Sequence, residues 1–285
     1  MTLRETIAAF HAEKKAIAHF NFSDSNQLKA IAEAAKETGL PIIVGLSEGE
    51  REYFGFSLAR ALVDVYKSQG VNIFLNADHT YSTELVQRAI TVGADSVVVD
   101  GARLGFDENL LMLTACVKYA RASGRDLIME GELGYIGQSS KMLDELPEGV
   151  SLENLTTVED AVRFVHESGI DCFAPAIGNV HGMLKFAKEP KLHVDRVKEI
   201  ADATGIPLVL HGASGNSEEE IVACIKAGIA IVHINTELRV LYRKALERAF
   251  ADKPEEVAPY KFLAPVAEEM KAYVMHKQRV FAGLA

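Results

Sequence analysis

The sequence is poor in cysteine, and its few cysteines are not arranged in pairs. Its 285 residues include only Cys116, Cys172 and Cys224, an odd number with wide spacing and no CxxC motif. This pattern excludes a disulfide framework and predicts reduced, mostly buried thiols. The sequence also lacks any run of about 18 apolar residues, the length that a membrane-spanning helix needs. We therefore expect a soluble, cytoplasmic protein.

Positive charge is also scarce. The chain has 40 acidic residues against 30 Lys and Arg, which gives a net charge of −10. An excess of negative charge repels nucleic acids and anionic lipids, so neither is expected as a partner. If such a protein binds a phosphate group, it must use local donors such as backbone N–H groups.

Apolar residues, by contrast, make up 48% of the chain, and eight short runs are rich in them. The runs cover residues 17–22, 41–46, 71–76, 96–100, 127–132, 172–177, 207–210 and 231–234. Between them lie helical patterns, two of which open with the candidate capping residues Ser25 and Ser217 and end at a glycine. Strands that alternate with helices predict a parallel sheet.

Eight such units in 285 residues are typical of one closed (β/α)8 barrel, an α/β fold of the TIM-barrel type. The alternative is an open doubly wound sheet, but the chain has no elements to spare for it. No linker divides the sequence, so we expect a single domain over residues 1–285. The longest connection, residues 134–159, is polar and contains glycine, as functional lids often do.

Chemically reactive side chains gather where the predicted strands end, which is where the active sites of such barrels lie. His79, His181 and His211 follow three different strands and would therefore meet at one rim. Three imidazoles that leave one position open are a common way to hold a catalytic zinc ion. We predict that these histidines bind Zn²⁺.

Three carboxylates accompany the histidines. Asp78 precedes His79 and is a candidate acid or base. Asp100 and Glu132 could orient the histidines or hold a displaced metal. The turn from Gly212 to Gly215 precedes a predicted helix, a position where barrels frequently bind phosphate, and Ser214 and Thr236 can add hydroxyl donors.

At these residues the sequence resembles the class II, metal-dependent fructose-bisphosphate and tagatose-bisphosphate aldolase family. The resemblance runs over nearly the whole chain. Its motifs are HFNFSD, NADHT, SVVVDG, EGELGYIG, AIGNVHGMLK, PLVLHGASG and HINTELR, in that order.

The resemblance implies a role for each matching residue. His79, His181 and His211 would bind zinc, with Glu132 and Asp100 near an alternate metal position. Asp78 would transfer a proton at the aldol oxygen. Residues around the phosphate of dihydroxyacetone phosphate, and in some members a monovalent cation (Na⁺ or K⁺), would be Gly182, Lys185, Gly212, Ser214, Asn235 and Thr236. Asn21 and Ser47 would line the substrate pocket.

The implied reaction is reversible cleavage of a ketose phosphate, with fructose 1,6-bisphosphate as the first candidate. The products would be dihydroxyacetone phosphate and an aldehyde, formed through a zinc-stabilised enediolate. The resemblance also implies a homodimer or homotetramer, and a place in carbohydrate metabolism such as glycolysis.

The chain departs from the family pattern at several places. The family usually carries a glutamate in the mobile loop, whereas this chain has Gln138, Ser139 and Ser140; Asp144, Glu145 or Glu148 are possible substitutes. His233 stands where many members have an asparagine that contacts substrate. Phe186 and Ala213 replace common glycines, and the C-terminus offers no clear arginine for a second phosphate.

Other functions stay open. The enzyme could act on tagatose bisphosphate, a ketose 1-phosphate or a deoxy-sugar phosphate. The chain could also be a non-catalytic sugar-phosphate sensor or another three-histidine barrel enzyme. A Schiff-base aldolase is disfavoured because no predicted strand contains lysine, and a NAD enzyme because no GxGxxG motif follows a strand.

Overall fold

The computed structural model describes residues 1–138, 140–150 and 155–284, and its centre is a closed barrel of eight parallel strands. This confirms the predicted (β/α)8 fold and excludes the open sheet. The order around the barrel is β1-β10-β9-β7-β5-β4-β3-β2, so the first and last strands close it. The strands are β1 (Ile17–Asn21), β2 (Ile42–Leu46), β3 (Ile73–Thr80), β4 (Ser96–Val99), β5 (Ile128–Leu133), β7 (Cys172–Pro175), β9 (Leu208–Leu210) and β10 (Ile229–Ile234).

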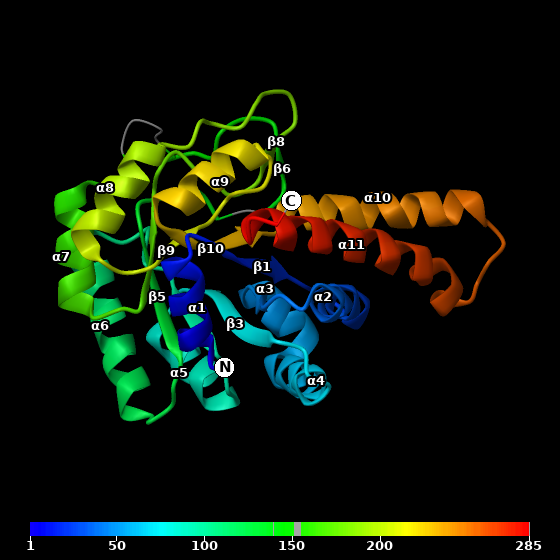
Figure 1. Cartoon of the computed structure of the whole chain (residues 1–285), viewed down its shortest axis with the longest axis horizontal. Coiled ribbons are helices and arrows are strands. Elements are labelled where there is room, and N and C mark those ends of the chain that lie inside the picture. The colour runs from blue at the N-terminus through cyan, green and yellow to red at the C-terminus, as the bar shows by residue number, and fades with distance from the viewer. Residues whose placement is uncertain (139, 151–154, 285) are drawn as a thin grey trace.

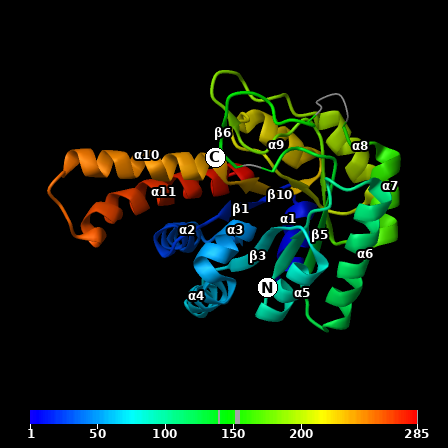
Figure 2. The same cartoon turned by 180° about the vertical axis from the view of Figure 1, so that it is seen from behind.

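Helices surround this barrel (Figure 1). They are α1 (Leu3–Ala12), α2 (Ser25–Thr38), α3 (Glu48–Glu50), the π-helical turn η1 (Arg51–Gly55), α4 (Phe56–Ser68), α5 (Thr83–Val92), α6 (Phe106–Ala122), α7 (Val158–Ser168), α8 (Val194–Thr204), α9 (Glu218–Ala227), α10 (Thr236–Asp252) and α11 (Pro259–Phe281). Helices α10 and α11 form a hairpin that projects to one side of the barrel (Figures 1 and 2).

The local signals at helix ends agree with the sequence in most respects. Ser217 caps α9 by accepting a hydrogen bond from Glu220 N, as predicted. The cap of α2 is Asp24, which accepts from Gln27 N, so the prediction of Ser25 was wrong by one residue. Gly39 ends α2 in the left-handed conformation, with φ of 68°.

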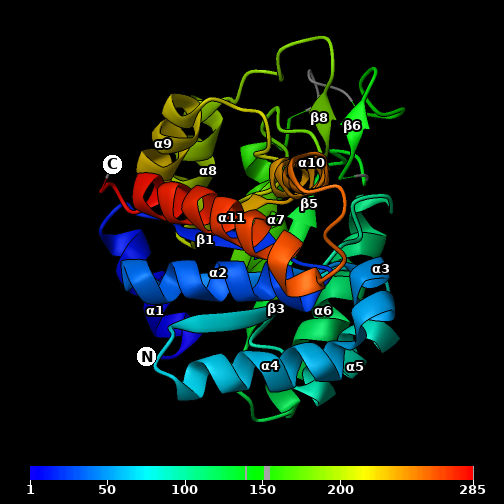
Figure 3. The same ribbon diagram turned by 90° about the vertical axis from the view of Figure 1, so that its right-hand side faces the viewer.

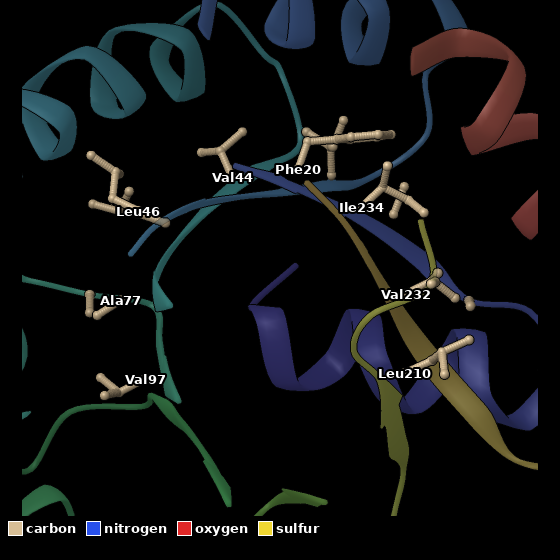
Figure 4. Packing of buried hydrophobic residues seen from close by; sticks show 14 of the residues in the cluster. Phe20, Val44, Leu46, Ala77, Val97, Leu210, Val232 and Ile234 are labelled. Carbon is tan, nitrogen blue, oxygen red and sulfur yellow. The ribbon is translucent and has the colours of Figure 1, made fainter. Parts of the chain in front are cut away.

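Apolar packing falls into three clusters, of which two belong to the barrel and the third, with Ala245 and Val266, lies within the α10–α11 hairpin. The outer faces of the strands pack against the helices, and Figure 4 shows Phe20, Val44 and Ile234 among the buried side chains of this layer. A second cluster fills the inside of the barrel at its N-terminal end, where Ile7 of α1 packs with residues such as Phe74. Helix α1 thus closes the N-terminal end of the barrel, and the opposite rim is open to a ligand.

The long connection after β5 contains structure that the sequence did not predict. Residues Met142–Leu143 (β6) pair in parallel with Met183–Leu184 (β8), and the two form a small separate sheet above the rim (Figure 3). In the part of the chain that the structure describes, no helix combines the length and the apolar character needed to cross a membrane.

Asp95 connects α4 to the sheet. Its carboxylate accepts hydrogen bonds from Leu75 N at 2.7 Å, Arg60 Nη1 at 2.9 Å and Lys67 Nζ at 3.0 Å. Its side chain is 21% exposed, whereas Asp64, which also pairs with Arg60, is 61% exposed.

We predict that Asp95→Asn lowers the free energy of unfolding by about 1–3 kcal/mol, because it weakens three charge-assisted hydrogen bonds at once. Asp64→Asn is the matched control and should cost less than about 1 kcal/mol, since an exposed ion pair contributes little. Urea denaturation followed by circular dichroism measures both. Equal losses in the two variants would show that the Asp95 cluster has no special role.

Candidate active site

A pocket of about 100 Å³ opens at the C-terminal ends of the strands. Ten residues predicted for the site line it: Asn21, Ser47, Asp78, His79, His181, Gly182, Gly212, Ser214, Asn235 and Thr236. It is also lined by Tyr81, Gln138, Ser140, His233 and Arg239. His211, Asp100 and Glu132 lie buried next to His79, behind the pocket wall.

Lys185 is the one predicted site residue that stands apart from this group. Its ammonium pairs with Asp144 at 2.9 Å, next to the small β6–β8 sheet, and it does not line the pocket. The other loop acids lie elsewhere too: Glu145 is exposed, and Glu148 lines a different hollow beside Arg103. Ser139 lies outside the described residues.

His79, His181 and His211 each offer a ring nitrogen, and these atoms lie within 4.8 Å of one another. In each ring one nitrogen has a fixed partner, and in His211 both do, since His211 Nδ1 lies 2.9 Å from Glu132 Oε2. His79 Nδ1 lies 3.0 Å from Asp100 Oδ2, and His181 Nδ1 lies 2.7 Å from the carbonyl of Gly137. His211 Nε2 lies 2.6 Å from Glu130 Oε1. Metal-binding histidines are normally held in this way, so the three residues fit a metal.

Glu130 was not assigned a role from the sequence. It lies two residues before Glu132 on β5, so both side chains point into the barrel and approach His211 from two sides. The sequence could have indicated this role, because the two glutamates of the EGE motif are two residues apart and side chains at alternate positions of a strand lie on the same face.

His79 has a backbone conformation that is rare for any residue but glycine, with φ of 77°. Strand β3 continues through Thr80, beyond the predicted end at Asn76. The Arg51 guanidinium, which belongs to η1, donates to the carbonyls of Leu46, Asp78 and His79. These bonds hold the end of β3 in the conformation that places Asp78 and His79 at the pocket.

Asp78 is buried, and its two oxygens differ. Oδ2 accepts a hydrogen bond from Asn21 Nδ2 at 2.8 Å, and the same amide nitrogen donates to Glu50. Oδ1 lies 3.7 Å from His79 Nε2 and 3.4 Å from His233 Nδ1. Burial raises the pKa of Asp78, but the charge of His79 and the neighbouring His233 outweigh it and hold that pKa well below its usual value. Asp78 is therefore an anion at neutral pH.

Neighbouring charges shift the pKa values of His79, His181 and His211, which we call the metal group, in different directions. Burial lowers the pKa of His79, but Asp78 and the hydrogen bond with Asp100 outweigh it and raise the pKa to about 9. The pKa of His211 is raised well above its usual value, because Glu130 and Glu132 outweigh burial. Burial and the charge of His79 lower the pKa of His181 to about 3. Without metal, two of the three rings are therefore protonated at pH 7.

Small residues and helix ends surround the other side of the pocket. Gly212 has φ of 60°, and a β carbon there would lie 2.5 Å from the carbonyl of Val180. Helix α10 begins at Thr236, and the backbone N–H groups of a first helical turn can bind an anion, although that of Glu237 donates to Ser214 Oγ at 3.3 Å. Arg239 bonds the carbonyl of Ser140 at 3.0 Å and also pairs with Glu50.

Comparison with known proteins places these features in one family. The sequence model described as fructose-bisphosphate aldolase class-II matches residues 1–283. A fructose-bisphosphate aldolase from Geobacillus stearothermophilus is 34% identical, over 99% of this chain and 97% of that protein. A 6-phospho-5-dehydro-2-deoxy-D-gluconate aldolase from Bacillus licheniformis is 35% identical, over 99% and 95%. The crystal structure of the YdjI aldolase from Escherichia coli K12 superposes with a TM-score of 0.81 at 28% identity, over 98% of this chain and 96% of that one.

We predict that Glu130→Gln weakens zinc affinity by about 10- to 100-fold, because the glutamine orients the His211 ring less firmly than the carboxylate does. Competition with a chromogenic chelator measures the affinity. Glu219→Gln, at an exposed position on α9, is the control and should bind zinc like the wild type. An unchanged affinity in Glu130→Gln would mean that Glu130 does not orient His211.

Zinc binding should also release protons. A metal takes only the unprotonated nitrogen, so His79 and His211 must each lose a proton when the ion binds at pH 7.5. The sign is therefore that affinity rises with pH, through the pKa of His79 at about 9 and until His211 has also lost its proton. Calorimetric titration in two buffers of different ionisation enthalpy should count about two protons released. A count of zero would contradict the charge states given above.

Proposed function

The chain belongs to the class II fructose-bisphosphate aldolase family, whose members are lyases, and we propose that it is a zinc enzyme that reversibly cleaves a ketose phosphate. The products would be dihydroxyacetone phosphate and an aldehyde. The observation that carries the proposal is the arrangement of His79, His181 and His211 beside the ionised carboxylate of Asp78.

The donor set favours zinc. Three imidazole nitrogens suit this ion better than they suit magnesium or calcium, which prefer oxygen ligands. Asp100 and Glu132 lie beside His79 and would offer an alternate position. When bound, zinc would supply Lewis acidity toward a ketone oxygen.

Asp78 is the residue for proton transfer at the aldol oxygen. It lines the pocket as an anion, and Asn21 holds one of its oxygens. In cleavage the carboxylate would accept the proton of the aldol hydroxyl, and in synthesis it would return that proton to the new alkoxide. Asp78 Oδ1 lies 3.7 Å from His79 Nε2, which is close enough for the carboxylate and a metal held by His79 to act on one substrate.

The phosphate of the dihydroxyacetone half would lie against Gly212, Ser214 and the first turn of α10, with Gly182 and Asn235 beside it. These groups offer hydrogen-bond donors with little net charge, which is the solution that an acidic protein requires. A monovalent cation near this phosphate, Na⁺ or K⁺, belongs to the same proposal.

The pocket residues indicate the aldehyde half of the substrate less closely than the phosphate half. Fructose 1,6-bisphosphate is the first candidate, since relatives carry that activity in their names. A ketose with a single phosphate is the second candidate. The observation that supports this second candidate is that Arg239 is the one Lys or Arg among the described pocket residues and is already paired with Glu50. A relative named for a deoxygluconate substrate keeps a third class open.

We also propose that the chain forms a homodimer or homotetramer. The projecting α10–α11 hairpin supports this, because Phe250, Val257 and Tyr260 are exposed on it. Apolar side chains grouped on a projecting arm are typical of surfaces that bind another protein.

Cleavage assays test the function directly. Fructose 1,6-bisphosphate and fructose 1-phosphate are each offered to the protein as purified, after a chelator, and after zinc is restored, and triose phosphate is detected. We expect activity that the chelator removes and zinc restores, and the ratio of the two rates shows whether a second phosphate is recognised. Binding of both sugars without cleavage by the zinc-loaded protein would favour the sensor.

Two variants separate metal binding from proton transfer. Asp78→Asn should keep its zinc and lose about 10²- to 10⁴-fold in kcat, since it loses the group that accepts the proton. His211→Ala should lose both zinc and activity. Metal content by atomic emission and kcat by coupled assay measure the difference, and full activity in either variant would overturn the assignment of these residues.

A further inference from the structure

Two histidine rings from opposite ends of the chain lie face to face inside the barrel. His19 on β1 and His233 on β10 are register partners where the barrel closes. Their ring centroids are 3.6 Å apart and their planes differ by 4°. His19 is fully buried and His233 is 7% exposed, at the pocket wall. Neither belongs to the three histidines that would bind zinc.

Hydrogen bonds determine the tautomer of His19. The Ser96 hydroxyl donates to Asn76 Oδ1 at 2.9 Å, which leaves Asn76 Nδ2 to donate to His19 Nε2 at 3.0 Å. Because Nε2 accepts, the proton of the neutral ring lies on Nδ1. Gly45 packs against the same edge of the ring, and a β carbon there would lie 2.3 Å from His19 Nε2. His19 is therefore fixed in one orientation.

The stacked rings do not fit a second metal. His19, Asp78 and His233 are close enough to form a metal group. However, a metal lies near the plane of each imidazole that binds it, and one ion cannot lie in the planes of two stacked, nearly parallel rings whose centroids are 3.6 Å apart. His19 Nδ1 also carries the proton, so it has no lone pair to offer.

His233 faces the oxygen of Asp78 that Asn21 leaves free. Asp78 Oδ1 is buried and has no hydrogen bond within the described residues, and His233 Nδ1 is 3.4 Å from it. A polar contact of this length in a ligand-free site can shorten into a hydrogen bond in the substrate complex. Asn21 on Oδ2 and His233 on Oδ1 then prevent the carboxylate from turning away from the pocket.

We propose that His19 and His233 are a positioning pair for Asp78. His233 donates its Nδ1–H to Asp78 Oδ1, and His19 supports the His233 ring in the plane that this bond requires. The inference rests on the proposed function, in which Asp78 transfers the proton at the aldol oxygen.

Two substitutions at His233 test the role of its hydrogen-bond donor separately from the role of the ring's volume. His233→Leu keeps much of the volume and removes the donor, and we expect kcat to fall about 10- to 100-fold with KM changed by less than about threefold. His233→Asn places an amide N–H near the position of Nδ1 and should restore kcat to within about fivefold of wild type. His166→Leu, the same exchange at an exposed position of α7, is the control. Equal losses in His233→Leu and His233→Asn would overturn the proposal.

A double-mutant cycle shows whether His233 acts through Asp78. In an Asp78→Asn background, His233→Leu should lower kcat by less than about threefold more, because the carboxylate that it positions is already gone. A loss as large as in the wild-type background would mean that His233 acts on the substrate or on the fold instead. Thermal melting of each variant identifies any that fail to fold.

A crystallographic comparison keeps the inference apart from the proposed function. If the zinc-loaded wild type cleaves no sugar phosphate, the proposed function fails, and the positions of the side chains still decide the inference. We expect the Asp78 carboxylate to lie as in wild type in His233→Asn and to be rotated in His233→Leu, with the His233 ring displaced in His19→Ala. An unmoved carboxylate in His233→Leu would overturn the positioning role.

Discussion

The structure depends on how the inside of the barrel accommodates charge. Side chains at alternate positions of eight parallel strands converge there, and above the apolar layer at the bottom they are mostly polar. An isolated ionised group would be very costly to bury at this depth, so each must have a partner of opposite charge or a hydrogen bond. Two rows of neighbouring side chains provide these partners. Glu130, His211 and Glu132 form one of them, and Asp100, His79 and Asp78 form the other.

The same requirement explains why the apolar packing that stabilises the fold and the reactive side chains lie at opposite ends of the barrel. Helix α1 and the apolar cluster close the N-terminal end, and ion pairs such as those of Asp95 connect the surrounding helices to the sheet. The rim can then hold groups that are poor for stability, including His79 with its positive φ. Strain of that kind persists only where its surroundings enforce it, and the bonds from Arg51 to the end of β3 do so here.

Much of the fold followed from the sequence, because apolar runs, caps and glycines report local structure. All eight barrel strands overlap the predicted runs, and the three histidines do meet. The β6–β8 pair could not be predicted, since two residues per strand leave no periodicity. His19 was missed for a different reason. It stands inside a strand, and only closure of the barrel brings it beside His233, which lies more than 200 residues further along the chain.

The loop after β5 departs from the family pattern, and the charged groups inside the barrel show what this departure changes. Gln138 and Ser140 are the described loop residues that line the pocket together with the strand ends, and neither side chain titrates. The described groups that can exchange a proton there are Asp78, His79 and His233 on strands β3 and β10, His181 in the loop after β7, and Tyr81 directly after β3. A group carried by a strand is held by its neighbours in the sheet, whereas a group on a loop must be brought into place by the movement of that loop. In this chain the precision of the site therefore depends on contacts within the barrel, and the stacked histidines where the barrel closes are among them, with His233 Nδ1 3.4 Å from Asp78 Oδ1.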